Sequence, residues 1–357
     1  MMFRRLFLWL GLLLFVSACV APTSTPKAIP AFVPTTINIS TVAPTPTIAY
    51  AENYADAISI TEFGQDNSPH LSWLPDNKTL IVWSEESTGS KSGEIRFMDS
   101  TNWQEVRSIK YKESIYYVGV DTEGRYLLIN DSILDFNSEQ YLYSLVPGGI
   151  PRGFSKNGEF IIGVGACGTL CGELRIWDAH TGKQQSELSN FADGYPTFAL
   201  SPDDQIVAFG DWQTRVTYWD VASGERLGSP IDAPPSGYVS SLTYSLDGKI
   251  LIAGVGYSVW LFDVDTGKIL HQLKSVNKYN VAMTVSPNNK MLSVAGAATD
   301  SNNIQFWEVS TGNLLYSLTT KNGISDLVFT PDGGSIIWGG SDGKVRLLSI
   351  PQLPIAS

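Results

Sequence analysis

The chain has 357 residues and a formal net charge of −11, from 24 Lys and Arg against 35 Asp and Glu. This charge has the wrong sign for a protein that binds the phosphate backbone of a nucleic acid, so no nucleic-acid partner is expected. The sequence contains no G-x-S-x-G elbow, no Walker-type phosphate loop and no H-E-x-x-H motif. We therefore predict no catalytic residues, no metal and no cofactor.

Residues 1–18 have the layout of a secretory signal peptide. A basic head, Met1–Arg5, precedes the apolar run Leu6–Val16, which is shorter than the roughly 20 residues that a membrane-spanning helix needs. The run ends in Val16-Ser17-Ala18-Cys19, which resembles a bacterial lipobox. That resemblance implies lipidation of Cys19 and a protein anchored to the outside of a bacterial cell membrane. The alternative is an ordinary signal peptide with an incidental cysteine.

Residues 19–55 are rich in proline and threonine and show no hydrophobic period. Proline at this density blocks both helix formation and strand pairing. The segment is therefore predicted to be an extended, flexible tether between the anchor and a globular domain.

The stretch Val239–Leu273 contains the unit on which residues 56–350 are built. It holds four short runs of β-branched and aromatic residues, separated by turn signals such as Asp247-Gly248 and Thr266-Gly267. Four such runs predict one antiparallel sheet of four strands. A single sheet of this size leaves apolar faces exposed, so it needs neighbours.

The neighbours are repeats of the same unit. The acid that ends the third strand recurs at steps of usually about 42–45 residues, a period typical of a β-propeller. Trp177-Asp178 and Trp219-Asp220 match the name-giving dipeptide of the WD-repeat family, which residues 57–350 resemble. The resemblance implies an all-β, seven-bladed propeller with four antiparallel strands per blade. Residues 351–357 are then a C-terminal tail.

The seventh repeat lacks its fourth strand, because the chain reaches Pro351 directly after Lys344–Ser349. The run Ala57–Phe63 precedes the first repeat and belongs to no unit of its own. A three-stranded last blade would leave an open edge and an unlinked ring. We therefore expect the N-terminal strand 57–63 to pair with Lys344–Ser349 and to close the ring.

Cys167 and Cys171 lie in the loop between the second and third strands of the third repeat. An exported protein lies where disulfides persist, so these residues are predicted to form a disulfide across the hairpin tip. A metal site or a redox pair remains the alternative. His70, His180 and His271 are scattered over different repeats, and a structural metal site usually needs four ligands.

The buried tetrad of the WD-repeat family uses a Gly-His pair before the first strand, and this sequence contains none. The repeats are therefore expected to rely on apolar packing. Tryptophans and one phenylalanine at strand positions are interpreted as packing residues between blades: Trp73, Trp83, Trp177, Trp219, Trp260, Trp307 and Phe329.

Loops before the first strand of each repeat should gather at one mouth of the central channel, together with the loops between the second and third strands. Tyrosine and arginine are favoured at the centres of protein interfaces. The predicted partner-binding rim is His70, Tyr116, Tyr117, Arg152, Tyr195, Trp212, Tyr238, Tyr257 and Tyr279. Alternatively, these tyrosines merely cover the blade ends.

The preferred functional interpretation is a membrane-anchored scaffold that holds a protein or peptide partner on this rim. Aromatic rims also stack on sugars, so a solute- or glycan-binding lipoprotein is the alternative. A propeller hydrolase or cofactor enzyme would need a charged cluster in the channel and is the third interpretation. Fold by itself does not choose among them.

Overall fold

The structure is a computed structural model of the chain. It describes residues 49–50, 57–64, 67–85, 92–165, 173–188, 197–211, 214–232, 238–275, 280–296 and 302–350. The predicted signal peptide, most of the predicted tether, the predicted C-terminal tail and all three cysteines lie outside these residues. No described residue belongs to a helix of the length and apolarity that a membrane crossing requires.

Seven antiparallel sheets follow one another along the chain, and each forms one blade. Blades 1 and 2 comprise β3 (Ser68–Trp73), β4 (Thr79–Glu85), β5 (Gly93–Asp99) and β6 (Glu105–Tyr111), then β7 (Val118–Val120), β8 (Tyr126–Ile129), β9 (Ser132–Asp135) and β10 (Tyr141–Ser144). Blades 3 and 4 comprise β11 (Gly149–Phe154), β12 (Phe160–Gly165), β13 (Leu174–Asp178) and β14 (Gln184–Leu188), then β15 (Thr197–Leu200), β16 (Ile206–Gly210), β17 (Arg215–Asp220) and β18 (Arg226–Asp232).

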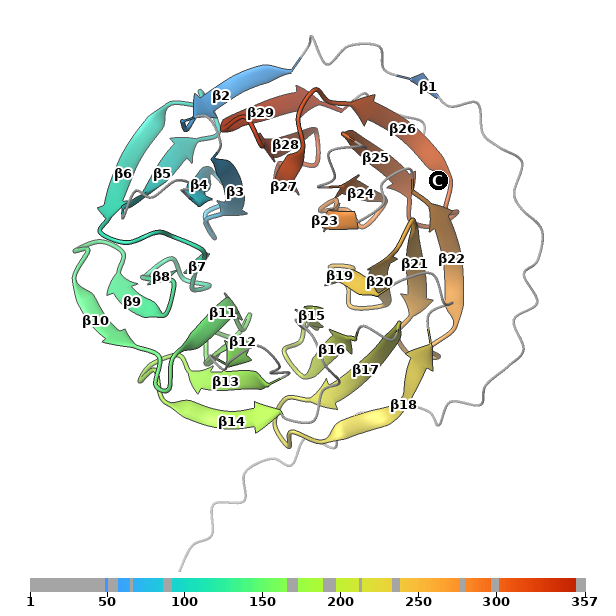
Figure 1. Cartoon of the computed structure of the whole chain (residues 1–357), viewed down its shortest axis with the longest axis horizontal. Coiled ribbons are helices and arrows are strands. Elements are labelled where there is room, and N and C mark those ends of the chain that lie inside the picture. Colours follow the sequence, from blue (N-terminus) through green and yellow to red (C-terminus); the bar gives the residue numbers. More distant parts are fainter. Residues whose placement is uncertain are drawn as a thin grey trace, which may run out of the picture.

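Blades 5 and 6 comprise β19 (Val239–Tyr244), β20 (Ile250–Val255), β21 (Ser258–Asp263) and β22 (Ile269–Lys274), then β23 (Asn280–Val285), β24 (Met291–Gly296), β25 (Asn303–Glu308) and β26 (Leu314–Thr319). Blade 7 comprises β27 (Ile324–Phe329), β28 (Ser335–Gly340), β29 (Lys344–Ser349) and β2 (Ile58–Glu62). The blades form a ring in which the first strand of each lies innermost and the fourth outermost (Figure 1). The predicted seven-bladed propeller is thus confirmed.

The ring closes through the N-terminal strand, as predicted. β2 pairs antiparallel with β29, with Ile58 opposite Leu347 and Glu62 opposite Lys344. Phe63, directly after β2, is buried and donates its backbone N–H to the carbonyl of Gly343 at 2.7 Å. The N-terminal end of the ring therefore supplies the outer strand of its last blade (Figure 1).

One hydrogen-bonded turn recurs between the first and second strands of the blades. In blade 5, the Ser245 hydroxyl donates to Asp247 at 2.7 Å and accepts the backbone N–H of Ile250 at 2.9 Å. The same arrangement links Ser201 with Asp203 in blade 4 and Thr330 with Asp332 in blade 7. A side chain that bonds the backbone in this way favours a tight turn over continued strand.

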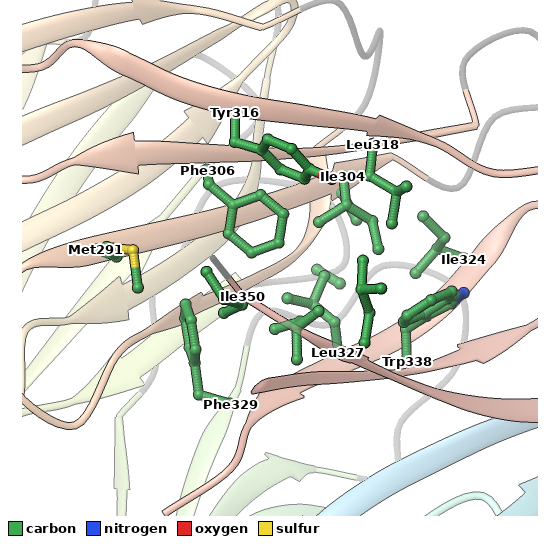
Figure 2. Close-up of a cluster of buried hydrophobic side chains, with 14 residues drawn as sticks. Met291, Ile304, Phe306, Tyr316, Leu318, Ile324, Leu327, Phe329, Trp338 and Ile350 are labelled. Atoms are coloured by element: carbon green, nitrogen blue, oxygen red, sulfur yellow. The ribbon is translucent and has the colours of Figure 1, made fainter. Parts of the chain in front are cut away.

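The hydrophobic core is divided among the seams between blades. Seven buried clusters each join neighbouring blades. Between blades 6 and 7, Phe306 and Tyr316 face Leu327, Phe329 and Trp338 (Figure 2). Because no blade has a complete core of its own, the free energy of burial depends on the ring as a whole.

The aromatic residues that the sequence assigns to packing lie in these clusters. Trp83, Trp177, Trp260, Trp307 and Phe329 are buried, and Trp73 and Trp219 are partly buried against neighbouring clusters. The Trp177 indole N–H donates to the carbonyl of Pro147 at 2.9 Å. The Trp73 indole N–H donates to the carbonyl of Phe329 at 2.9 Å, which links blade 1 to blade 7.

A short strand lies within the predicted tether. β1 (Ala49–Tyr50) pairs in parallel with β26, with Ala49 opposite Tyr316 and Tyr50 opposite Ser317. Blade 6 therefore has a fifth strand on its outer edge. The proline content of residues 19–55 predicts no strand pairing, so this two-residue strand differs from the expectation of a fully extended, unpaired tether.

Candidate functional site

Two kinds of connection alternate along each blade and define the two faces of the ring. We call the loop face the side that carries the connections between blades and the loops between second and third strands. The carbonyl of Tyr257, in the loop between β20 and β21, accepts the N–H of Ser275, which follows β22, at 2.9 Å. The carbonyl of Gly323 accepts the N–H of Ser341 at 2.8 Å in the same way in blade 7. The turns between first and second strands and between third and fourth strands lie on the opposite side, which we call the turn face.

Tyr116 is presented on the loop face by a buried asparagine. The Asn130 side chain accepts the N–H of Tyr116 at 3.0 Å and donates to the carbonyl of Ser114 at 2.9 Å. Ile115 between them is fully buried in the seam between blades 1 and 2. Tyr116 itself is 39% exposed. Burial and the nearby Asp131 raise the pKa of Tyr116, so its hydroxyl stays neutral and able to donate near neutral pH.

Blade 5 presents two further exposed tyrosines on the same face. Tyr238 precedes β19 and is 42% exposed, while its neighbour Val239 is buried and donates its N–H to the carbonyl of Asp211. Tyr257 is 54% exposed in the loop between β20 and β21. In both blades a buried or hydrogen-bonded backbone holds an exposed ring, which lowers the entropy lost when a partner binds.

Two predicted rim residues lie in strands rather than in loops, and a third lies in its predicted loop but packs inward. His70 is in β3 and Arg152 is in β11, because both first strands begin before these residues. His70 stacks on Trp83 with ring centroids 5.6 Å apart, and its Nδ1 lies 3.8 Å from Asp326 of blade 7. Tyr117 packs against the cluster between blades 2 and 3. Burial raises the pKa of Tyr117, so this side chain acts in packing rather than as an exposed contact.

The loop face also carries arginines outside the predicted rim. The motif G-E-x-R occurs at Gly93–Arg96 and at 172–175. Arg96 donates to Glu94 at 2.7 Å and to the carbonyl of Glu62 at 2.9 Å, so it fastens β2 to blade 1. Arg175 donates to the carbonyl of Gly148 at 3.0 Å, in the connection between blades 2 and 3.

A second acid–arginine spacing recurs in blades 4 and 7. Arg215 donates to Asp211 at 2.7 Å, and Arg346 donates to both carboxylate oxygens of Asp342, at 2.9 and 2.5 Å. Burial would raise the pKa of Asp342, but its hydrogen bonds and the charge of Arg346 hold that pKa below its ordinary value. Asp342 is therefore an ion-pair partner of Arg346 as well as a member of a Ser-Asp-Gly turn. The recurring E-x-R and D-x-x-x-R spacings were the signal available in the sequence.

The turn face has a different electrostatic character. Its turns and the strand ends next to them carry more than twice as many acidic as basic side chains. The acidic residues are Asp76, Asp99, Glu105, Asp121, Glu123, Asp135, Glu139, Glu159, Asp178, Asp203, Asp204, Asp220, Glu225, Asp247, Asp263, Asp265, Glu308 and Asp332; the basic residues are Lys78, Arg125, Lys156, Lys183, Arg226, Lys249, Lys268 and Lys290. Most of the net negative charge therefore lies on the face opposite the exposed tyrosines.

Several predicted site residues are outside the described part of the chain. These are the lipidation residue Cys19, the predicted disulfide pair Cys167 and Cys171, and the rim residues Tyr195, Trp212 and Tyr279. Among the residues that the structure describes, no three His, Cys, Asp or Glu side chains gather closely enough to hold a metal ion. The described loop face thus carries exposed tyrosines on blades 2 and 5, on opposite sides of the ring (Figure 1), and paired arginines on other blades.

The seven four-stranded blades, the turn pattern and the ring closed by a terminal strand define a WD-repeat-like β-propeller protein. The family model of the nucleolar protein 10-like N-terminal domain, a β-propeller, matches residues 165–357, which is more than half of the chain. The chain belongs to this family.

Curated relatives carry the same repeats. The WD repeat-containing protein srw1 of Schizosaccharomyces pombe is 23% identical over 191 residues, covering 53% of this chain and 34% of the relative. WD repeat-containing protein 18 of Danio rerio is 21% identical over 243 residues, covering 54% and 56%. Protein NEDD1 of Homo sapiens is 25% identical over 198 residues, covering 53% and 30%. The chain thus spans between about a third and just over half of the length of these relatives.

Proposed function

We propose that this propeller is an interaction module that binds a protein or peptide partner on its loop face. The observation that carries the proposal is the display of Tyr116, Tyr238 and Tyr257 on that face, each beside a backbone held by a buried residue or a hydrogen bond. A tyrosine offers a large contact area and a hydroxyl at low cost in side-chain entropy.

The arginines of the loop face support the same function. Arg96 and Arg175 hold the connections near the rim through carbonyl and carboxylate contacts. A rim built in this way keeps its shape in the absence of a partner, and preorganisation of this kind favours affinity. The membership of the WD-repeat class supports a scaffold role.

We also propose that the module is anchored outside the cell membrane by lipid on Cys19, with residues 19–55 as its tether. The lipobox-like sequence Val16–Cys19 and the proline-rich stretch after it support this arrangement. Substitution Cys19→Ala should move the protein from the membrane fraction to the soluble fraction. Retention of the variant in the membrane fraction would show that the cysteine is not the anchor.

Capture from solubilised cell envelope tests the partner site. The full chain and a Tyr116→Ala, Tyr238→Ala, Tyr257→Ala variant serve as baits. A Tyr141→Ala variant is the matched control, because Tyr141 is 61% exposed on the outer strand of blade 2. We expect one protein to be captured by the wild type and the control, and several-fold less by the triple variant.

Equal capture by all three baits, or recovery of the bait alone, would contradict the proposal. A thermal-shift series with oligosaccharides is run beside it. A rise in melting temperature that the triple variant loses would replace the protein partner with a glycan ligand, since bound ligand stabilises the folded state.

A further inference from the structure

One position of the innermost strands differs in blade 3. A backbone hydrogen bond closes the turn after each innermost strand, in blade 3 from the N–H of Ser155 to the carbonyl of Phe160. Three residues before this donor, blade 3 has Arg152, which is exposed. The other six blades have an apolar side chain there, which packs in the seam with the preceding blade: Leu71, Val118, Phe198, Leu242, Met283 and Leu327.

The backbone of β11 turns Arg152 away from the seam. Pro151 pairs with Gly163 and Gly153 pairs with Ile162, so Arg152 is the extra residue of a β-bulge. A bulge of this kind re-aims a side chain. β11 is the innermost strand of its blade, with blades 2 and 4 on its two sides (Figure 1). An exposed side chain in the middle of this strand therefore faces the central channel.

The hydroxyl of Tyr117 lies near this arginine. The Tyr117 ring packs in the seam between blades 2 and 3, where the other blades place their apolar residue. A Cβ atom at Gly119 would lie 2.8 Å from the Tyr117 hydroxyl, and one at Gly153 would lie 3.8 Å from it, so the hydroxyl ends between β7 and β11. Burial raises the pKa of Tyr117, against the opposing charge of Arg152. The neutral hydroxyl therefore leaves the guanidinium charge uncompensated.

Arg152 also lacks a carboxylate partner in the described part of the chain. Six other arginines there form ion pairs with Asp or Glu: Arg96, Arg107, Arg125, Arg175, Arg215 and Arg346. Asp326 is the one acidic residue in the described innermost strands. Its carboxylate already accepts the N–H of Leu71 at 3.0 Å and that of Leu327 at 2.8 Å. Two donors thus face the channel without an acceptor from these strands.

We propose that Arg152 and the Tyr117 hydroxyl bind a carboxylate of the loop-face partner, the side chain of an aspartate or glutamate that enters the channel beside Tyr116. The inference rests on the proposed loop-face function, since Tyr116 directly precedes Tyr117 and is exposed on that face. A guanidinium pairs with a carboxylate through two parallel hydrogen bonds, and a neutral phenol can add a third donor.

The charge of the site favours a carboxylate over a phosphate. The described innermost strands contain no Lys and no Arg besides Arg152. One guanidinium balances the single charge of a carboxylate, whereas a phosphate dianion would need a second cation. A positive charge inside a channel with low-dielectric walls also attracts an anion more strongly than one on an open surface.

Titration with defined peptides tests the site in the absence of the partner. The full chain is labelled with isotopically enriched arginine, and the guanidinium N–H signals are followed by NMR; Arg152→Gln assigns the Arg152 signal. The probes are acetyl-Gly-Glu-Gly-amide and the matched acetyl-Gly-Gln-Gly-amide. We expect the Glu peptide to shift the Arg152 signal at a several-fold lower concentration than the signal of Arg226, which is exposed on the outer strand β18. The Gln peptide should shift neither.

Tyr117→Phe keeps the ring and removes the hydroxyl, so it should raise the half-saturating concentration of the Glu peptide several-fold. Equal responses of Arg152 and Arg226, or equal shifts from the two peptides, would overturn the carboxylate site. Stronger binding of acetyl-Gly-Gly with a free C-terminal carboxylate would overturn the assignment to a side chain. Stronger binding of acetyl-Gly-phosphoserine-Gly-amide would overturn the choice of a carboxylate.

Capture from solubilised envelope separates this inference from the loop-face function. We expect Arg152→Gln to capture several-fold less partner than the wild type, and the control Arg226→Gln to capture as much. Full capture by Arg152→Gln, with capture lost in the triple tyrosine variant, would overturn the inference and leave the loop-face function standing. Recovery of the bait alone would contradict the loop-face function and the partner assignment, and the peptide titration would then decide whether the carboxylate site exists.

Discussion

The carboxylate of Asp204 in blade 4 accepts the backbone N–H of Lys156 in blade 3 at 2.7 Å. Its other oxygen accepts the N–H of Asn157, also at 2.7 Å. Asp204 is buried and has a positive φ of 61°. A turn residue of one blade thus satisfies the turn backbone of the preceding blade.

The residue type at the position of Asp204 differs among the blades, and it depends on the residue that it contacts in the preceding blade. The turn of blade 5 has a backbone N–H at Leu246. Asn289, which takes the place of Asp204 in blade 6, accepts this N–H at 2.8 Å. Where the preceding turn has proline, which has no N–H, the next blade has glycine. Gly124 lies next to Pro75, Gly248 next to Pro202 and Gly333 next to Pro287. Neighbouring turns are therefore matched at these five seams, whereas between blades 2 and 3 Gly158 lies next to Thr122 instead of a proline.

Substitution Asp204→Gly tests this matching. Glycine tolerates the positive φ and occurs at the same place in other blades, so the change removes the two hydrogen bonds without adding backbone strain. Two partly buried N–H groups lose a charged acceptor, and we expect a loss of about 1–3 kcal/mol in the free energy of unfolding. Urea unfolding followed by tryptophan fluorescence measures it.

The matched control is Glu225→Gly, at an exposed position of the neighbouring turn of the same blade, where a few tenths of a kcal/mol to about 1 kcal/mol is expected from the glycine alone. An Asp204→Gly protein no less stable than this control would show that the seam contact contributes nothing.

Asn130 should be required for the placement of Tyr116. Asn130→Asp keeps the acceptor for the Tyr116 N–H but replaces the donor to Ser114 with an anionic oxygen that faces a carbonyl. We expect a loss of about 1–3 kcal/mol at neutral pH and faster hydrogen exchange at the Tyr116 amide. Asn102→Asp on the exposed turn face, where only the acceptor is used, is the control. Unchanged exchange at Tyr116 would contradict the role of Asn130.

The aspartate carboxylates of the turns should make the free energy of unfolding depend on pH in the acid range. Burial by itself would raise the pKa of Asp178, but hydrogen bonds from Thr181 and His180 hold that pKa below its ordinary value. A carboxyl whose folded pKa is lowered stabilises the fold above its unfolded pKa, and this stabilisation is lost as the pH falls through the folded pKa. Thr181→Val raises the folded pKa toward the unfolded one, so acid unfolding should begin at higher pH.

The control is Thr319→Val, which removes a hydroxyl that donates to the amide of Asn303, a group that does not titrate. This variant should lose stability equally across the acid range. A Thr181→Val protein whose acid midpoint is unchanged from wild type would show that the turn hydrogen bond does not act through the Asp178 carboxyl.

The repeats made the fold predictable because each blade repeats the same local rules. Pairs such as Asp247-Gly248 and Thr266-Gly267 mark turns through a positive φ, and the missing fourth strand of blade 7 predicts its replacement by Ala57–Phe63. The loss of the Gly-His pair led to the expectation of apolar packing. The structure adds Arg96, Arg175 and Asn130. The recurring G-E-x-R spacing marks the two arginines in the sequence, but their carbonyl partners, and that of Asn130, lie 16 to 34 residues away and are not marked by it.

The candidate site was less predictable than the fold. Tyr116, Tyr238 and Tyr257 are exposed on the expected face, but Tyr117 packs into the seam beside Gly119. Adjacent tyrosines look alike in the sequence. The Asn130 side chain accepts the N–H of both tyrosines, at 3.0 Å from Tyr116 and 3.4 Å from Tyr117, so the two side chains leave one held backbone in different directions and the sequence does not mark which of them is exposed.

Ring closure is tested most directly by deleting residues 57–63 and measuring the free energy of unfolding in urea against the full chain. The deletion removes β2, the buried Phe63 and the contacts of Arg96 with Thr61 and Glu62. We predict a loss of about 3 kcal/mol or more, the size expected from removing a buried phenylalanine alone. A deletion variant that unfolds at the same urea concentration and with the same cooperativity as the full chain would contradict closure by the N-terminal strand.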